Sequence, residues 1–172
     1  EGLNTDPRMM SVMLFKRLWN NHKGFLVLWQ KNLPLEAAIV LRSGIEAAIC
    51  ITANRAMKDR FVELMRLDAA FTVKGQAKRY REVGDIEAAG EAQLTFEHLI
   101  ATLPKGSKPA SLKWKDLADE GGIPSLYTYH RMLSGASSHV TGMSILRGVT
   151  HDEESALLQA EYDALTRRLH LM

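Results

Sequence analysis

The amino-acid sequence predicts an all-α protein: a single-domain bundle of five to seven helices, in antiparallel pairs, with a central helix at about 34–57. Apolar residues recur every three to four positions through most of the chain, which is the period of an amphipathic helix. No stretch alternates apolar and polar residues for long enough to form a half-buried strand. Prolines, glycines and capping residues separate the periodic stretches, so each stretch has its own start and end.

The stretch 34–57 is the helix around which we expect the others to pack. It opens with Pro34, which is well tolerated at the first helical position because it has no N–H to lose there. Most of its circumference is Ala, Val, Leu and Ile, which predicts burial on all sides. Arg42 and Glu46 nevertheless fall one turn apart in an apolar sector. Burying either charge alone is costly, so we expect the two side chains to pair and to gain further hydrogen bonds.

The remaining helices follow from the same periodicity and from their start signals. Asp6-Pro7 opens the first helix, which we expect to reach about residue 32 and to be able to bend at Gly24. A Leu-Pro step then leads directly into the central helix, and so short a connection implies an antiparallel pair. Prolines, glycine, serines and lysines predict a long loop at about 103–113. Further helices are expected at about 58–82, 86–102, 114–120, 124–143 and 152–170.

The composition describes an ordinary globular chain of 172 residues, with 46% hydrophobic residues, 24% charged residues and a net charge of +2. One domain over 1–172 is the simplest arrangement at this length. The single cysteine, Cys50, lies mid-helix among aliphatic residues, which favours a buried apolar residue over a reactive thiol. We expect no signal peptide before the first helix, although a sequence that starts at Glu1 can lack an upstream segment, and no uncharged apolar run approaches the roughly 20 residues of a membrane span. We therefore expect a cytoplasmic protein without membrane contact.

The third and fourth helices carry opposite charge. The third ends with a basic cluster, and the segment from Glu82 to Leu103 carries acids and no lysine or arginine. Two interpretations stay open: the two helices pair as neighbours, or the cluster contacts nucleic acid. The basic residues concerned are Lys74, Lys78, Arg79 and Arg81.

The helix at about 124–143 carries a polar stripe beside its apolar packing seam. Tyr127, Arg131 and Ser134 follow helical spacing along this stripe, with His130 and His139 at its margins. A solvated polar face explains the stripe, but arginine and histidine are also the residues that hold phosphate and move protons. The histidines show no His-Glu-x-x-His or Glu-x-x-His grouping, and no glycine-rich phosphate loop is present. The sequence therefore predicts neither a metal site nor a cofactor.

Three features of the sequence carry a resemblance: Arg-x-x-x-Glu at Arg42 and Glu46, a basic third helix, and the late pattern Tyr-x-x-x-Arg-x-x-Ser-x-x-x-x-His. With them the sequence resembles an uncharacterised family of bacterial all-helical proteins, a domain of unknown function. The resemblance covers about residues 30–145. A looser similarity is to the HEPN-type superfamily of helical toxins and defence ribonucleases, whose motif is Arg-x(4–6)-His on a late helix. Here seven residues separate Arg131 from His139, which on a straight helix spaces their Cα atoms roughly 12 Å apart.

Two hypotheses for function follow. In the first, which the looser similarity implies, the chain acts on RNA or a nucleotide in a toxin or defence setting, as a metal-independent ribonuclease. Arg131 and His139 then hold phosphate and move the proton, while Arg42, Glu46, Tyr127 and Ser134 form the supporting polar cluster. In the second, the chain is a non-catalytic helical module with a structural Arg42–Glu46 pair, and its exposed methionine and tryptophan residues bind a protein partner or a second copy in a homo-oligomer.

Overall fold

The computed structural model describes residues 6–136, 163, 164 and 167, and its regular structure is entirely helical over these residues. The predicted all-α class is confirmed. The central helix has the predicted bounds, and the other described helices begin and end within two residues of expectation, apart from the last. The helices are α1 (Pro7–Gln30), α2 (Pro34–Met57), α3 (Asp59–Glu82), α4 (Ile86–Ala101), α5 (Trp114–Glu120) and α6 (Pro124–Ala136).

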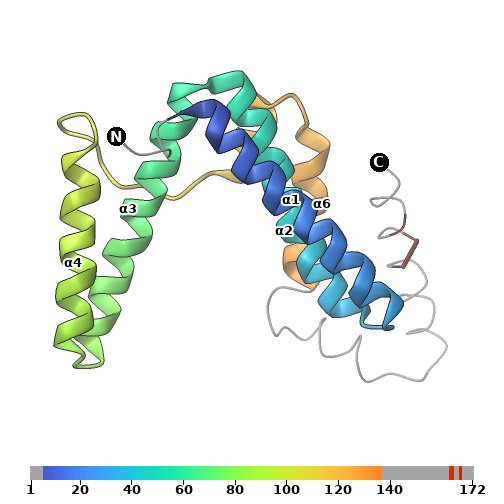
Figure 1. Ribbon diagram of the computed structural model, residues 1–172, viewed down its shortest axis with the longest axis horizontal. Coiled ribbons are helices and arrows are strands. Elements are labelled where there is room, and N and C mark those ends of the chain that lie inside the picture. Colours follow the sequence, from blue (N-terminus) through green and yellow to red (C-terminus); the bar gives the residue numbers. More distant parts are fainter. Residues whose placement is uncertain (1–5, 137–162, 165–166, 168–172) are drawn as a thin grey trace.

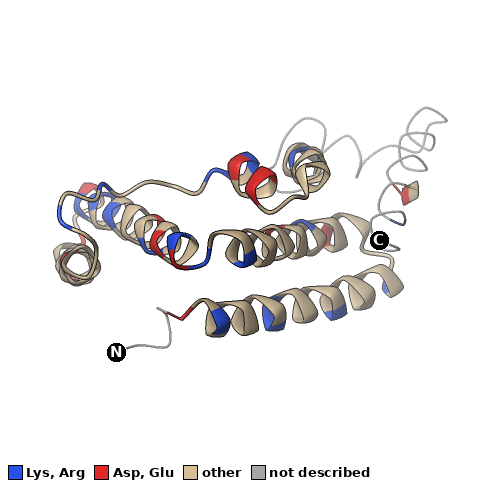
Figure 2. Ribbon diagram, turned by 90° about the horizontal axis from the view of Figure 1, so that it is seen from above, with Lys and Arg blue, Asp and Glu red and all other residues tan. Residues whose placement is uncertain are grey.

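The helices form a layered bundle with a projecting hairpin. Helix α2 lies between α1 on one side and α5 and α6 on the other, as Figure 2 shows. Helices α3 and α4 pack on each other and stand apart from this bundle (Figure 1). The prediction that 34–57 is central is therefore confirmed, because three helices use different sides of α2.

Local chemistry sets the ends of α1, α2 and α3. The Asp6 carboxylate accepts a hydrogen bond from the Arg8 backbone N–H at 2.8 Å, which caps the first turn of α1. Pro34 occupies the first turn of α2. Lys58 alone joins α2 to α3, with a φ of 53°, and the chain bends sharply at this one residue (Figure 1). The junction directs α3 away from the bundle.

The core is centred on α2 and is built from small and aliphatic side chains. Ala38, Ile49 and Ala53 of α2 are fully buried, and Phe61 and Leu133 reach them from α3 and α6. Alanine at these positions lets neighbouring helices approach the α2 backbone closely. Gly121, which follows α5, also lies close to the α2 backbone. A Cβ at this position would clash with the Thr52 hydroxyl and lie 3.0 Å from the Ala53 backbone nitrogen.

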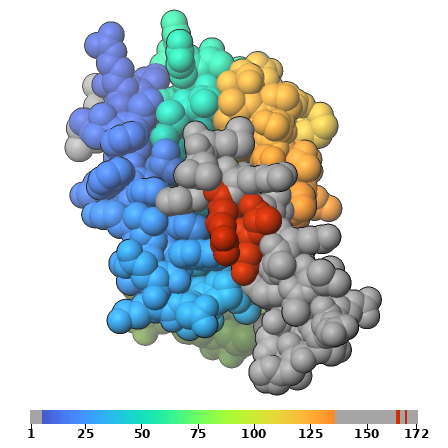
Figure 3. Space-filling view, turned by 90° about the vertical axis from the view of Figure 1, so that its right-hand side faces the viewer, coloured from blue at the N-terminus to red at the C-terminus, as the bar shows by residue number. Residues whose placement is uncertain are grey.

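Two predicted elements extend beyond the described residues. The helix expected at 124–143 is seen as far as Ala136, and only residues 163, 164 and 167 of the one expected at 152–170 are described. The guanidinium of Arg167 lies 6.0 Å from the centre of the Trp29 ring of α1. Figure 3 shows the described C-terminal residues in red on this face of the molecule, beside α1.

Cys50 is buried in α2, as the sequence predicts. Burial, followed by the nearby charge of Glu46, raises the pKa of its thiol to about 12. A thiol with this pKa has almost no thiolate at pH 8, so we expect a disulfide reagent to modify native Cys50 at least about 100-fold more slowly than the urea-unfolded chain. Stopped-flow thiol titration measures both rates. Equal rates would show that Cys50 is accessible and contradict its place in the core.

Candidate functional site

Four polar side chains from α2 and α6 form the most connected group in the described part of the chain, here called the α2–α6 cluster. Its members are Arg42, Glu46, His130 and Ser134. Arg42 Nη2 lies 2.8 Å from Glu46 Oε1, and the same oxygen lies 3.0 Å from His130 Nε2. Arg42 Nε donates to Ser134 Oγ at 2.9 Å. Ser134 Oγ in turn donates to the backbone carbonyl of His130 at 2.7 Å.

Matching helical spacing explains why these four residues meet. Arg42 and Glu46 are one turn apart on α2, and His130 and Ser134 are one turn apart on α6. Arg42 pairs with Ser134 and Glu46 pairs with His130, so the order reverses between the helices. This reversal is the register of two antiparallel helices. The cluster therefore fixes both the rotation and the position of α6 along α2.

Burial within the cluster increases towards the histidine. The side chains of Arg42 and Glu46 are 27% and 18% exposed, whereas that of His130 is 5% exposed. The rings of Trp114 and Tyr127 lie 5.3 and 6.3 Å from the His130 ring, centre to centre. Because a carboxylate only accepts hydrogen bonds, His130 Nε2 carries the proton that faces Glu46. Within the described structure, the buried Nδ1 of His130 has no hydrogen-bond partner.

The structure brings together some of the predicted site residues and separates others. Arg42, Glu46 and Ser134 are in one cluster, and Tyr127 stacks beside it. Arg131 is exposed on α6, because it follows His130 by one residue and points about 100° further round the helix. His139 lies outside the described residues. The polar stripe of α6 therefore divides: Tyr127 and Ser134 lie towards α2, while Arg131 is exposed.

Sequence reasoning placed His130 only at the margin of the stripe and missed its part in the cluster. A signal for it was present. His130 precedes Ser134 by four residues, which is the spacing of Arg42 and Glu46, so two antiparallel helices can pair all four. The pairing needs a polar residue at both α6 positions, and a single helix cannot reveal which partner it faces.

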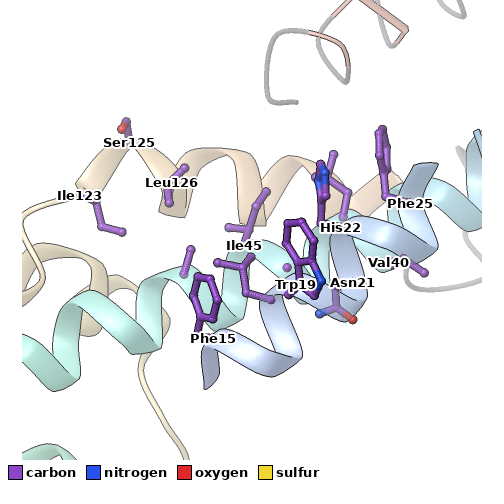
Figure 4. A pocket seen from close by; sticks show the side chains of 14 residues that line it. Phe15, Trp19, Asn21, His22, Phe25, Val40, Ile45, Ile123, Ser125 and Leu126 are labelled. Atoms are coloured by element: carbon purple, nitrogen blue, oxygen red, sulfur yellow. The ribbon is translucent and has the colours of Figure 1, made fainter. Parts of the chain in front are cut away.

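An apolar groove of about 600 Å³ lies beside the cluster, between α1, α2 and the start of α6. Phe15 and Trp19 line it from α1, Ile45 from α2 and Leu126 from α6, and Figure 4 shows these side chains converging on it. Trp19 stacks on His22 with ring centres 5.7 Å apart. The residues of the α2–α6 cluster do not line the groove. The groove and the cluster are thus separate features.

The basic residues predicted as a patch are all exposed near the free end of α3: Lys74, Lys78, Arg79 and Arg81. Helix α4 packs alongside them, as one of the two interpretations expected. Arg81 Nη2 donates to Gln93 Oε1 at 2.8 Å, and Lys74 Nζ lies 5.9 Å above the centre of the Phe96 ring. Packing against α4 therefore leaves the charges of the patch accessible to solvent.

A family model described as a family of unknown function, DUF5677, matches residues 8–156. This chain belongs to the DUF5677 family. No curated protein and no solved structure matches it. The matched residues include the whole range, about 30–145, over which the sequence resembles a family of unknown function. The predicted membership of a family of unknown function is therefore confirmed.

The matched region of this DUF5677 chain contains the α2–α6 cluster, the groove and the basic patch. Among its described residues, no group of three or more histidine, cysteine, aspartate or glutamate side chains is arranged to hold a metal ion. Over the same residues, none of the helices is both long enough and apolar enough to span a bilayer.

Proposed function

We propose that this DUF5677 protein is a non-catalytic helical interaction module, which holds a rigid bundle and presents apolar surfaces to a protein partner or a second copy. The observation that carries the proposal is that the side chains of the α2–α6 cluster bond one another across the two helices. Glu46 Oε1 lies within hydrogen-bond distance of both Arg42 and His130, and Ser134 accepts from Arg42 while donating to a backbone carbonyl. Side chains that hydrogen-bond one another across two helices fix how those helices pack.

The exposed apolar residues of α1 also support an interaction role. Phe15 and Trp19 are 61% and 53% exposed beside the groove, and Val12 is 62% exposed one turn earlier. Large apolar side chains clustered on one exposed surface commonly mark a site of protein association. The polar cluster behind them keeps α6 in place and so preserves the shape of the groove.

A second candidate function is action on RNA or a nucleotide, with the chain as a metal-independent ribonuclease of the toxin or defence type. The exposure of the basic patch and of Arg131 favours it, because cations that bind phosphate must reach solvent. In this function Arg131 holds phosphate and His139 moves the proton. Arg42 and Glu46 position them, and Tyr127 and Ser134 donate hydrogen bonds.

One experiment separates the two functions. Purified protein is incubated with a mixed RNA pool over a range of salt and divalent-ion concentrations, beside His139→Ala, Arg131→Ala and the matched control His98→Ala. His98 is exposed on α4 and belongs to neither proposed site. The module predicts no cleavage by any of the four proteins. Cleavage by the wild type and His98→Ala that disappears in folded His139→Ala and Arg131→Ala would instead establish the ribonuclease.

A further inference from the structure

We infer that the α3–α4 hairpin is a self-association surface, which docks on the same hairpin of a second copy and forms a four-helix bundle with it. The inference rests on the proposed interaction module and names its partner. Helix α4 packs on α3 and makes no other extensive contact with the described helices. Its remaining sides are therefore not covered by the other described helices, and Figure 1 shows the hairpin projecting from the described bundle.

Helix α4 exposes an apolar stripe interrupted by a glycine, and α3 exposes an aromatic residue followed one turn later by a glycine. On α4, Ile86 and Leu94 are 72% and 68% exposed and lie four residues before and after Gly90. On α3, Phe71 is 49% exposed and lies four residues before Gly75. Positions four residues apart share one face of a helix, so each set forms a continuous stripe.

Contacts between the helices place the two stripes on the same side of the hairpin. Lys74, three residues after Phe71 on α3, extends to the Phe96 ring of α4. Further along, Arg81 donates to Gln93, whose Nε2 donates to Glu97 Oε1 at 2.8 Å. Glu97 follows Leu94 by three residues and therefore neighbours it on α4. These bridges run along the side that carries both stripes, which makes one broad face.

The two glycines are unexplained by the fold of a single chain. A Cβ at Gly75 or at Gly90 would have no neighbouring atom within 4 Å. Glycine within a helix lowers its stability relative to alanine, so its presence twice on one exposed face calls for a reason. Close approach of another helix supplies that reason, because a missing Cβ lets a neighbouring side chain or backbone pack more deeply.

Charge selects a second copy as the partner. The outer half of α3 carries the basic patch and one acid, Glu82, whereas α4 carries Glu87, Glu91 and Glu97 and no lysine or arginine. A two-fold axis parallel to the hairpin places α3 of each chain on α4 of the other, so opposite charges meet twice. A second copy presents this complementary pattern through the same face, and two-fold dimers are the commonest assemblies of identical chains.

Sedimentation velocity of the full chain from low to high micromolar concentration tests the inference. We expect a monomer–dimer equilibrium for the wild type. In Ile86→Lys/Leu94→Lys, two buried ammonium groups in each chain should raise the dimer dissociation constant by about 100-fold or more. The matched control Val27→Lys/Met132→Lys alters two exposed apolar residues outside the hairpin and should leave the dimer unchanged. Circular dichroism confirms the helical content of each variant.

Gly90→Ala gives a second, independent test because its two expected effects have opposite sign. The added methyl meets nothing in a single chain, so dilute protein should melt at a higher temperature than the wild type. The same methyl should weaken the dimer by roughly tenfold if helices approach at Gly90. A wild type that stays monomeric at every concentration, a lysine variant that still dimerises, or a Gly90→Ala dimer of unchanged affinity would each overturn the inference.

These results are distinguishable from a failure of the proposed function. A monomeric wild type that cleaves no RNA would refute the second copy as partner and leave the interaction module in place. A hairpin-dependent dimer whose cleavage of RNA requires His139 would refute the non-catalytic module and leave the self-association surface in place.

Discussion

Replacing Glu46 by leucine is expected to lower the free energy of unfolding by about 3 kcal/mol. The Glu46 carboxylate faces both Arg42 and His130, so its loss leaves two donors without this acceptor. His130, with a side chain 5% exposed, cannot turn to water. The Arg42 side chain is 27% exposed and can turn to water. The expected loss of stability is therefore at the lower end of the range for breaking a buried charge pair. Urea unfolding followed by circular dichroism measures the change.

Compensating substitutions show whether the cluster is architectural. Arg42→Met/Glu46→Leu removes both charges but leaves His130 Nε2 buried without its acceptor, so we expect a loss of about 1–2 kcal/mol, smaller than that of Glu46→Leu alone. Adding His130→Phe replaces the last buried polar ring by an apolar one and should recover most of this loss. Glu36→Leu, at an exposed position in the first turn of α2, is the matched control and should change stability by less than about 0.5 kcal/mol. If Arg42→Met/Glu46→Leu is as unstable as Glu46→Leu, then Arg42 and Glu46 are not a mutually compensating pair.

Replacing Gly121 by alanine is expected to cost about 2–3 kcal/mol of stability. Its Cβ would clash with the Thr52 hydroxyl and lie 3.0 Å from the backbone nitrogen of Ala53, which is buried near the C-terminal end of α2. A backbone atom in a buried helix cannot move aside, so α5 and the start of α6 must shift instead. Thermal or urea unfolding of the variant gives the cost directly.

The neighbouring glycine is the control for this experiment. Gly122 has a φ of +74° and no atom within 4 Å of an added Cβ, so Gly122→Ala should cost only about 1 kcal/mol, through backbone strain. Thr52→Ala/Gly121→Ala removes the Thr52 hydroxyl and should recover part of the lost stability. The recovery should be incomplete, because the close contact with the Ala53 backbone remains. Wild-type stability in Gly121→Ala would mean that α5 does not sit this close to α2.

The stability of these variants also bears on function. If the α2–α6 cluster only fixes helix register, the triple variant should keep the dimer that the hairpin forms. If the cluster supports a ribonuclease, the same folded variant should lose cleavage of RNA. Measuring both dimer formation and RNA cleavage in the triple variant therefore separates an architectural role of the cluster from a catalytic one.

The sequence alone determined the features that depend on neighbouring residues. Helical spacing, proline at a first turn and an aspartate cap act within a few residues, so α2 and the bounds of the other described helices could be predicted closely. The Arg42–Glu46 pair was predictable for the same reason, since both side chains lie on one helix, one turn apart.

Only the tertiary structure decided which helices those side chains meet. His130 becomes the partner of Glu46 because α6 lies antiparallel to α2, and the two residues are 84 positions apart in the sequence. The groove requires three helices at once, and the projection of the hairpin follows from one left-handed residue, Lys58. Helical periodicity shows which face of a helix is apolar, but packing between distant segments selects what covers that face.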